Sequence, residues 1–290
     1  SVEPLEASIQ ERVPLLGSDR VPPYTGEGKG GPDPYEEDVV LTDNTSSLYL
    51  FPLNGHTYNT TTNLLYPTMK IFLDTADVNE VARRIDTGLI SGVTTNPTLI
   101  RKTGRRPSDV YRALDNLDYI TDVSIEVVAD TAIQMYEEGI TAADNYETAT
   151  IKLPCTEEGL RACMLLNDQK VRTNVTLVFS PAQAILASLA GARYISPFVG
   201  RLNDNSVDGL KLIADIFALH MPCTQILAAS IRDVPSVSQA FRYGADICTL
   251  PPAIFDKMYK HVLTDQGLAQ FNKDYAETNF KASDIPRYPQ

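Results

Sequence analysis

A lysine inside an apolar segment is the residue of this 290-residue chain that is best suited to covalent chemistry. Lys152 lies in ATIKLP (149–154), where every other side chain is uncharged. Burying a lysine is costly unless its amine is neutral or paired with an acid, and a neutral amine is a nucleophile toward carbonyl carbons. We interpret Lys152 as a candidate nucleophile. The alternative is a lysine whose amine reaches solvent or forms a buried ion pair with Asp74 or Glu126.

Two acidic residues lie in comparable positions. Glu126 lies within the apolar segment SIEVV (124–128), and Asp74 ends the segment KIFLD (70–74). Burial favours the protonated form of a carboxyl group, which suits proton transfer near neutral pH, so Glu126 is a candidate acid–base residue. Asp74 is a candidate for orienting the amine or a substrate hydroxyl. The alternatives are a salt bridge from Glu126 to Lys152 and a helix N-cap formed by Asp74.

Side chains that suit an anion follow two later segments. Arg201 follows RYISPFV (193–199), and both Ser230 and Arg232 follow CTQILAA (223–229). Arginine offers fixed, permanently charged donors that match phosphate oxygens, and a serine hydroxyl can bind the same anion. For each arginine taken alone, a solvated position on the surface is the alternative.

A regular alternation of elements must position these residues. From Met69 onward, short apolar runs alternate eight times with segments of helical spacing. The expected strands are 70–74, 88–96, 122–128, 148–154, 171–178, 193–199, 223–229 and 247–251. The expected helices are 78–85, 107–117, 131–146, 157–169, 180–191, 206–220, 235–244 and 252–263, followed by a last amphipathic helix over 264–277.

Strands made of continuous apolar runs are buried on both faces, which predicts a parallel sheet. Eight β/α units most simply close into an α/β fold of the (β/α)8 TIM-barrel type. An open doubly wound sheet is the alternative, although no GxGxxG follows the first strand. In a barrel the active site lies at the carboxyl ends of the strands. The polar candidates expected there are Asp74, Thr94, Thr95, Asn96, Glu126, Lys152, Asn174, Thr176, Arg201, Ser230 and Arg232, while Phe198 is expected to pack in the core.

Residues 1–68 differ from the rest of the chain. They hold eight of its nineteen prolines, and ten acidic residues against three basic ones, so they carry −7 of the net charge of −12. Such a composition predicts a mostly irregular acidic extension, with a possible small β patch near 46–66, ahead of a barrel domain over 69–290.

Composition also limits the expected partners and location. The acidic balance argues against nucleic acid or an anionic membrane surface as a partner, and no apolar run approaches the ~20 residues of a membrane span. The four cysteines and three histidines show no metal-binding spacing, so no metal site is expected. The first ten residues lack the pattern of a secretory signal, and we expect a cytoplasmic protein.

Several separated blocks resemble the transaldolase family. GVTTNPTLI (92–100), IKLP (151–154), the stretch 188–201 and LAAS (227–230) are similar, in this order, to the family's signature, to the surroundings of its Schiff-base lysine and to its later blocks. The resemblance runs from residue 69 to about residue 277 and is closest to the small transaldolases, the subfamily shared with fructose-6-phosphate aldolase. Residues 1–68 match nothing in that family.

Two positions separate the members of this subfamily. The aldolases carry glutamine and tyrosine where this chain has Glu126 and Phe198, which is the transaldolase pattern. The resemblance therefore implies transfer of a dihydroxyacetone unit from fructose 6-phosphate or sedoheptulose 7-phosphate to an aldose phosphate, in the pentose phosphate pathway. The alternatives are an aldolase that releases free dihydroxyacetone and a barrel that serves only as a binding scaffold.

The resemblance also implies a role for each residue. Lys152 would form the Schiff base, and Glu126 would move protons through a water beside Thr176. Substrate hydroxyls and the distal phosphate would be bound by Asp74, Thr95, Asn96, Phe198, Arg201, Ser230 and Arg232. No cofactor is implied. Because the last helix of related small transaldolases contacts a neighbouring subunit, the resemblance also implies a homo-oligomer with a ring-like arrangement.

Overall fold

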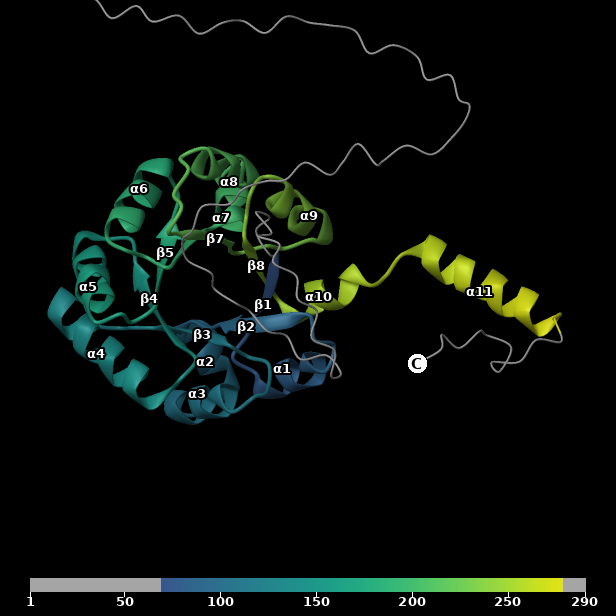
Figure 1. Ribbon diagram of the computed structural model, residues 1–290, viewed down its shortest axis with the longest axis horizontal. Coiled ribbons are helices and arrows are strands. Elements are labelled where there is room, and N and C mark those ends of the chain that lie inside the picture. Colours follow the sequence, from purple (N-terminus) through teal and green to yellow (C-terminus); the bar gives the residue numbers. More distant parts are fainter. Residues whose placement is uncertain (1–68, 279–290) are drawn as a thin grey trace, which may run out of the picture. The chain divides into compact units, whose positions relative to one another are not determined.

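The computed structural model of the chain describes residues 69–278, and these residues form the expected (β/α)8 barrel (Figure 1). Eight parallel strands lie in sequence order around a closed sheet, and β1 pairs with both β2 and β8. The strands are β1 (Lys70–Asp74), β2 (Ile90–Thr94), β3 (Asp122–Glu126), β4 (Ala149–Pro154), β5 (Thr173–Val178), β6 (Tyr194–Pro197), β7 (Gln225–Ala228) and β8 (Ile247–Leu250). The predicted extension 1–68 and its possible β patch lie outside the described residues.

Helices surround the strands on the outside of the barrel (Figure 1). They are α1 (Val78–Ile85), α2 (Pro97–Thr103), α3 (Pro107–Asp115), α4 (Ala132–Asn145), α5 (Glu157–Asp168), α6 (Pro181–Leu189), α7 (Val199–Asp204), α8 (Gly209–Phe217), α9 (Val234–Arg242) and α10 (Pro252–Met258). A further helix, α11 (Val262–Ala276), follows at the end of the described chain.

Side chains of each strand alternate between two different environments. The outward side chains, such as Leu73, Val93 and Ile151, are buried against the helices in one large apolar core. The inward side chains form a smaller cluster around Phe72 and Tyr194, whose rings meet edge to face with centroids 6.2 Å apart. Because strand side chains alternate with a period of two, an apolar outer face leaves every second position free to carry polar groups into the barrel.

The structure corrects the expected joints between elements at three places. Two short helices, α2 and α7, lie where the sequence was expected to run directly from strand to helix. The side chain of Asn96 caps α2 by accepting from the backbone N–H of Leu99, and Pro97 begins the helix. The expected helix 252–263 ends at Met258, and a new helix begins after His261, whose extended backbone and side chain cap its first turn.

The last helix, α11, confirms that a helix is present at 264–277 and begins two residues earlier than expected. None of its residues is buried, and apolar side chains such as Leu268, Phe271 and Tyr275 are more than half exposed. Within residues 69–278, no helix is both long enough and apolar enough to cross a membrane.

The close approach of α5 to the end of β4 gives a test of the packing around the site. A Cβ atom added to Gly159, in the first turn of α5, would lie 2.0 Å from the carbonyl oxygen of Pro154. Since a strand carbonyl cannot move aside, Gly159→Ala should lower the free energy of unfolding by about 1–3 kcal/mol or more, measured by urea denaturation. Gly267→Ala is the control, because nothing lies within 4 Å of its added Cβ. Equal stability of the two variants would contradict the packing described.

Candidate active site

Among residues 69–278, the amine of Lys152 has two partners inside the barrel. Lys152 is 5% exposed, and its Nζ lies 2.9 Å from Oε2 of Glu126 and donates to the carbonyl oxygen of Thr95 at 3.0 Å. The register of the parallel strands places Glu126 directly beside Lys152. The ion pair between Lys152 and Glu126 that the sequence left as an alternative is therefore present, with the Lys152 side chain 7% and the Glu126 side chain 22% exposed.

The carbonyl of Thr95 is held in place by the rest of the residue. Thr95 is fully buried, and its hydroxyl donates to the carbonyl oxygen of Ser124 at 2.8 Å. The backbone N–H of Thr95 donates to the same oxygen at 3.2 Å. Thr95, predicted to contact substrate, provides a backbone carbonyl as an acceptor for the amine of Lys152.

A cavity of about 140 Å³ lies next to Lys152 at the carboxyl ends of the strands. Six of the predicted site residues line it: Asp74, Asn96, Lys152, Phe198, Arg201 and Ser230. The remaining lining residues are Thr94, Ser196, Leu227, Ala229 and Thr249. The structure thus brings residues from six strands or strand ends to one small space, as the barrel topology requires.

Asp74 is partly buried at the edge of this cavity. Its Oδ1 accepts a hydrogen bond of 2.8 Å from the hydroxyl of Thr94, which also lies 2.6 Å from the hydroxyl of Thr249. Burial raises the pKa of Asp74, while the hydrogen bond from Thr94 and the charge of Lys152 act in the opposite direction. The N-cap alternative for Asp74 is wrong, because Asp77 caps α1 by accepting from two backbone N–H groups.

A second polar chain crosses the interior from β3 to β6. Asn174 donates to the hydroxyl of Ser124 at 3.1 Å and accepts from the hydroxyl of Ser196 at 2.7 Å. Thr176 follows Asn174 on the same face of β5, and its buried hydroxyl has no partner within residues 69–278. A buried hydroxyl of this kind is suited to a bound water or a ligand atom.

The two arginines lie at different places around the cavity. The guanidinium of Arg201, which lines the cavity, lies over the ring of Phe198 with its carbon 5.1 Å from the ring centroid. Phe198 lines the cavity and also packs against Phe179, with ring centroids 5.9 Å apart. Arg232 does not line the cavity but pairs with Asp204 beside it.

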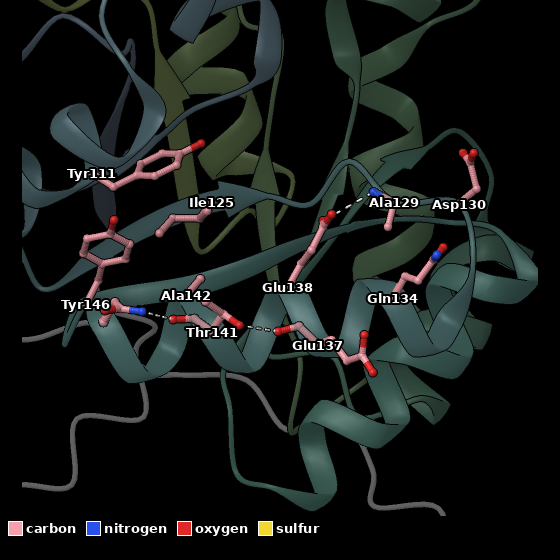
Figure 2. Close-up of a pocket in the computed structure, with 11 residues that line it drawn as sticks. Tyr111, Ile125, Ala129, Asp130, Gln134, Glu137, Glu138, Thr141, Ala142 and Tyr146 are labelled. Carbon is pink, nitrogen blue, oxygen red and sulfur yellow. Dashed lines mark hydrogen bonds between the residues drawn. The ribbon is translucent and has the colours of Figure 1, made fainter.

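A larger groove lies on the outer face of the barrel. It has a volume of about 650 Å³ and runs between α3 and α4 over Ile125 of β3 (Figure 2). Figure 2 shows the rings of Tyr111 and Tyr146 near one another, and Glu138 accepting from the backbone of the loop that follows β3. None of the predicted site residues lines this groove. The smaller cavity, which holds the buried amine, is therefore the candidate active site.

The sequence predicted most of this site but not Ser196 and Thr249, two lining residues with hydroxyl groups. Thr94, which was expected at the end of its strand, also lines the cavity. The available signal was the period of two along each strand, which places Ser196 on the same face as Phe198. Asp204 was also missed, because it lies in a polar run that reads as an ordinary surface helix.

Comparison with known proteins decides the family. A family model described as Transaldolase/Fructose-6-phosphate aldolase matches residues 71–285. The chain belongs to this family. A relative from Caulobacter vibrioides (strain NA1000 / CB15N), named "Probable transaldolase", is 49% identical over 213 residues, which cover 72% of this chain and 98% of the relative. A relative of the same name from Paracoccus denitrificans (strain Pd 1222) is 49% identical over 218 residues, covering 73% and 99%.

Membership of the transaldolase/fructose-6-phosphate aldolase family agrees with the barrel and confirms the resemblance seen in the sequence. All ten predicted site residues lie within the matched range. The family supports an enzyme of the transaldolase or aldolase type.

The raised pKa of Asp74 predicts how stability depends on pH. The pKa of Asp74 is higher in the folded state than its ordinary value of 3.8. The folded state therefore loses stability as the pH rises from 3.8 through the pKa of the folded state, because the buried carboxyl group must ionise. Asp74→Asn removes this cost and keeps an oxygen for Thr94. The variant should melt at a higher temperature than the wild type at pH 7, with the difference vanishing below about pH 3.8.

Asp256→Asn is the control, because it should change the melting temperature at pH 7 in the opposite direction. Hydrogen bonds from Arg84 hold the pKa of Asp256 below its ordinary value, so this variant should be less stable than the wild type at pH 7. Melting curves by circular dichroism at several pH values compare the two variants. A lower melting temperature for Asp74→Asn at pH 7 would contradict the burial assigned to this carboxylate.

Proposed function

We propose that this protein is a transaldolase that transfers a dihydroxyacetone unit from a ketose phosphate to an aldose phosphate through a Schiff base on Lys152. The observation that carries the proposal is a buried amine between a carboxylate and a backbone carbonyl, facing a small polar cavity with an arginine in its lining. The donor would be fructose 6-phosphate or sedoheptulose 7-phosphate. The chemistry needs only the amine and carboxyl groups of the chain.

The first step uses the ion pair. Glu126 takes a proton from the ammonium group of Lys152, which lies 2.9 Å away, and the free amine attacks the C2 carbonyl of the ketose. The resulting carbinolamine loses its hydroxyl as water when Glu126 returns the proton. The product is an iminium ion, whose positive nitrogen accepts electrons in the next step.

The second step breaks the C3–C4 bond. The C4 hydroxyl loses a proton to the Glu126 carboxylate through a water, the bond electrons move to the iminium, and the aldose leaves. Thr176 would hold this water, because its buried hydroxyl has no partner within residues 69–278. The enamine that remains on Lys152 then attacks the aldehyde carbon of the acceptor, and the same steps in reverse release the new ketose.

The size of the cavity supports a three-carbon donor fragment. A cavity of about 150 Å³ holds a benzene molecule, and dihydroxyacetone has a similar number of heavy atoms, so a cavity of about 140 Å³ is suited to it. Asp74 and Asn96 in its lining would bind the hydroxyls of this fragment. Arg201 and Ser230, also in the lining, and the nearby Arg232 would bind the phosphate at the far end of the sugar.

We further propose that the protein forms a homo-oligomer. The exposed apolar side chains of α11, among them Leu268 and Phe271, support a role for this helix in contacts between subunits, as the resemblance implies. Sugar phosphates would be the partners of a cytoplasmic enzyme of the pentose phosphate pathway. Light scattering of the full chain measures the number of subunits.

The loss of the amine gives the direct mutational test. Lys152→Arg keeps a positive charge for Glu126 but cannot form an imine, so transfer activity should fall by about 10⁴-fold or more. Lys152→Met, which is close to lysine in volume, should show the same loss. The matched control is Lys211→Arg, which changes a lysine paired with Asp215 on α8 and should keep full activity. Substantial turnover by a folded Lys152→Arg variant would contradict the mechanism.

An acceptor test separates transaldolase from the aldolase alternative. The family includes enzymes of both kinds. Phe198 has no hydroxyl group that could protonate the enamine and so allow free dihydroxyacetone to be released. We therefore expect fructose 6-phosphate to be consumed rapidly with erythrose 4-phosphate present, and at least about 10²-fold more slowly without it. A coupled assay for glyceraldehyde 3-phosphate measures both rates. Equal rates with and without the acceptor would show an aldolase.

A further inference from the structure

We propose that Asp204, which touches no part of the cavity, is a positioning residue that fixes Arg232 for binding the phosphate group of the substrate. The inference rests on the proposed function and assigns to α7 a share in selecting phosphorylated sugars. The proposal rests on two observations. Asp204 binds Nη1 and Nη2 of Arg232, and Nε of Arg232 lies near Ser230.

Asp204 holds the guanidinium of Arg232 end-on. Nη1 of Arg232 pairs with Oδ1 of Asp204, and Nη2 donates to Oδ2 at 2.6 Å. A guanidinium has a second two-donor edge, formed by Nε and Nη2, which matches two oxygens of a phosphate. Among the hydrogen bonds of residues 69–278, none is donated by Nε of Arg232, so this second edge keeps a free donor.

The free edge lies beside Ser230. A Cβ atom added to Gly200 would lie 2.3 Å from the carbonyl oxygen of Ser230, 2.7 Å from Nε of Arg232 and 2.9 Å from Oγ of Ser230. The donor Nε and the Ser230 hydroxyl therefore lie close to the same point beside the backbone of Gly200, and Ser230 itself lines the cavity. The backbone N–H of Gly200 donates to the carbonyl oxygen of Ser230 at 3.0 Å, which ties α7 to the segment that carries Arg232.

The positive charges around Asp204 favour its ionised form, which is the form that binds a guanidinium. The guanidinium of Arg232 holds the pKa of Asp204 below its ordinary value, and the charge of Arg201 acts in the same direction. Both members of the pair are about half exposed, with side chains 53% and 50% accessible, so the pair adds little to the stability of the fold. Its effect lies in ordering a long, flexible side chain before the anion arrives, which lowers the entropic cost of binding.

The variant Asp204→Asn tests the proposal. We expect it to raise the KM for fructose 6-phosphate about tenfold, as expected when one well-placed contact is lost, with kcat nearly unchanged. The KM for unphosphorylated fructose should not change. Binding of inorganic phosphate, followed by phosphorus NMR without any substrate, should weaken by a similar factor. The phosphate titration does not require turnover, so it tests the proposal even if the proposed reaction is not found.

Two further variants complete the design. Asp215→Asn makes the same change in an exposed pair with Lys211 on α8 and should leave phosphate binding and both KM values as in the wild type. Arg232→Ala should weaken phosphate binding by itself, and adding Asp204→Asn to it should have no further effect, because Asp204 acts through Arg232. Unchanged or tighter phosphate binding by Asp204→Asn, or equal effects on phosphorylated and unphosphorylated sugars, would overturn the proposal.

Discussion

The structure depends on keeping one ammonium group and one carboxylate paired inside a closed barrel. Lys152 and Glu126 lie on neighbouring parallel strands in direct register, 2.9 Å apart, with a backbone carbonyl as the other acceptor for the amine. Removing two charges from water is costly, and only close pairing and further hydrogen bonds offset that cost. An arrangement of this kind is hard to explain as a source of stability and easy to explain as a reactive group kept ready for proton transfer.

The barrel supplies the conditions for this pair. Its outer apolar faces pack against the helices and stabilise the fold, which leaves the inner faces free to carry hydroxyl, amide and carboxylate groups. Several hydrogen-bonded chains cross the interior, among them one through Asp74, Thr94 and Thr249 and another through Ser124, Asn174 and Ser196. Such networks fix the orientation of each polar group before substrate binds, which is the main requirement of electrostatic catalysis.

Much of the fold could be predicted from the sequence because its strands are short continuous apolar runs. All eight expected strands are present, and Lys152 and Glu126 were recognised because a charge in an apolar run is unusual. The helix α2 was missed because Asn96 and Pro97 also suit a loop, and only the tertiary structure shows that Asn96 caps a helix. Ser196 and Thr249 were missed because a small hydroxyl side chain in a strand does not stand out as a charge does, and only the period of two relative to Phe198 marks Ser196 as an inward residue. Asp204 could not be found, because its partner Arg232 comes from a different strand end.

The central claim is that the buried amine of Lys152 forms a covalent bond with the carbonyl carbon of a sugar. The most direct measurement is reduction with borohydride in the presence of fructose 6-phosphate, followed by mass spectrometry of the peptides. The account predicts a stable adduct of the dihydroxyacetone fragment on Lys152 and on no other lysine, together with loss of activity. An enzyme that stays active and unmodified under these conditions, or an adduct on a surface lysine, would contradict it.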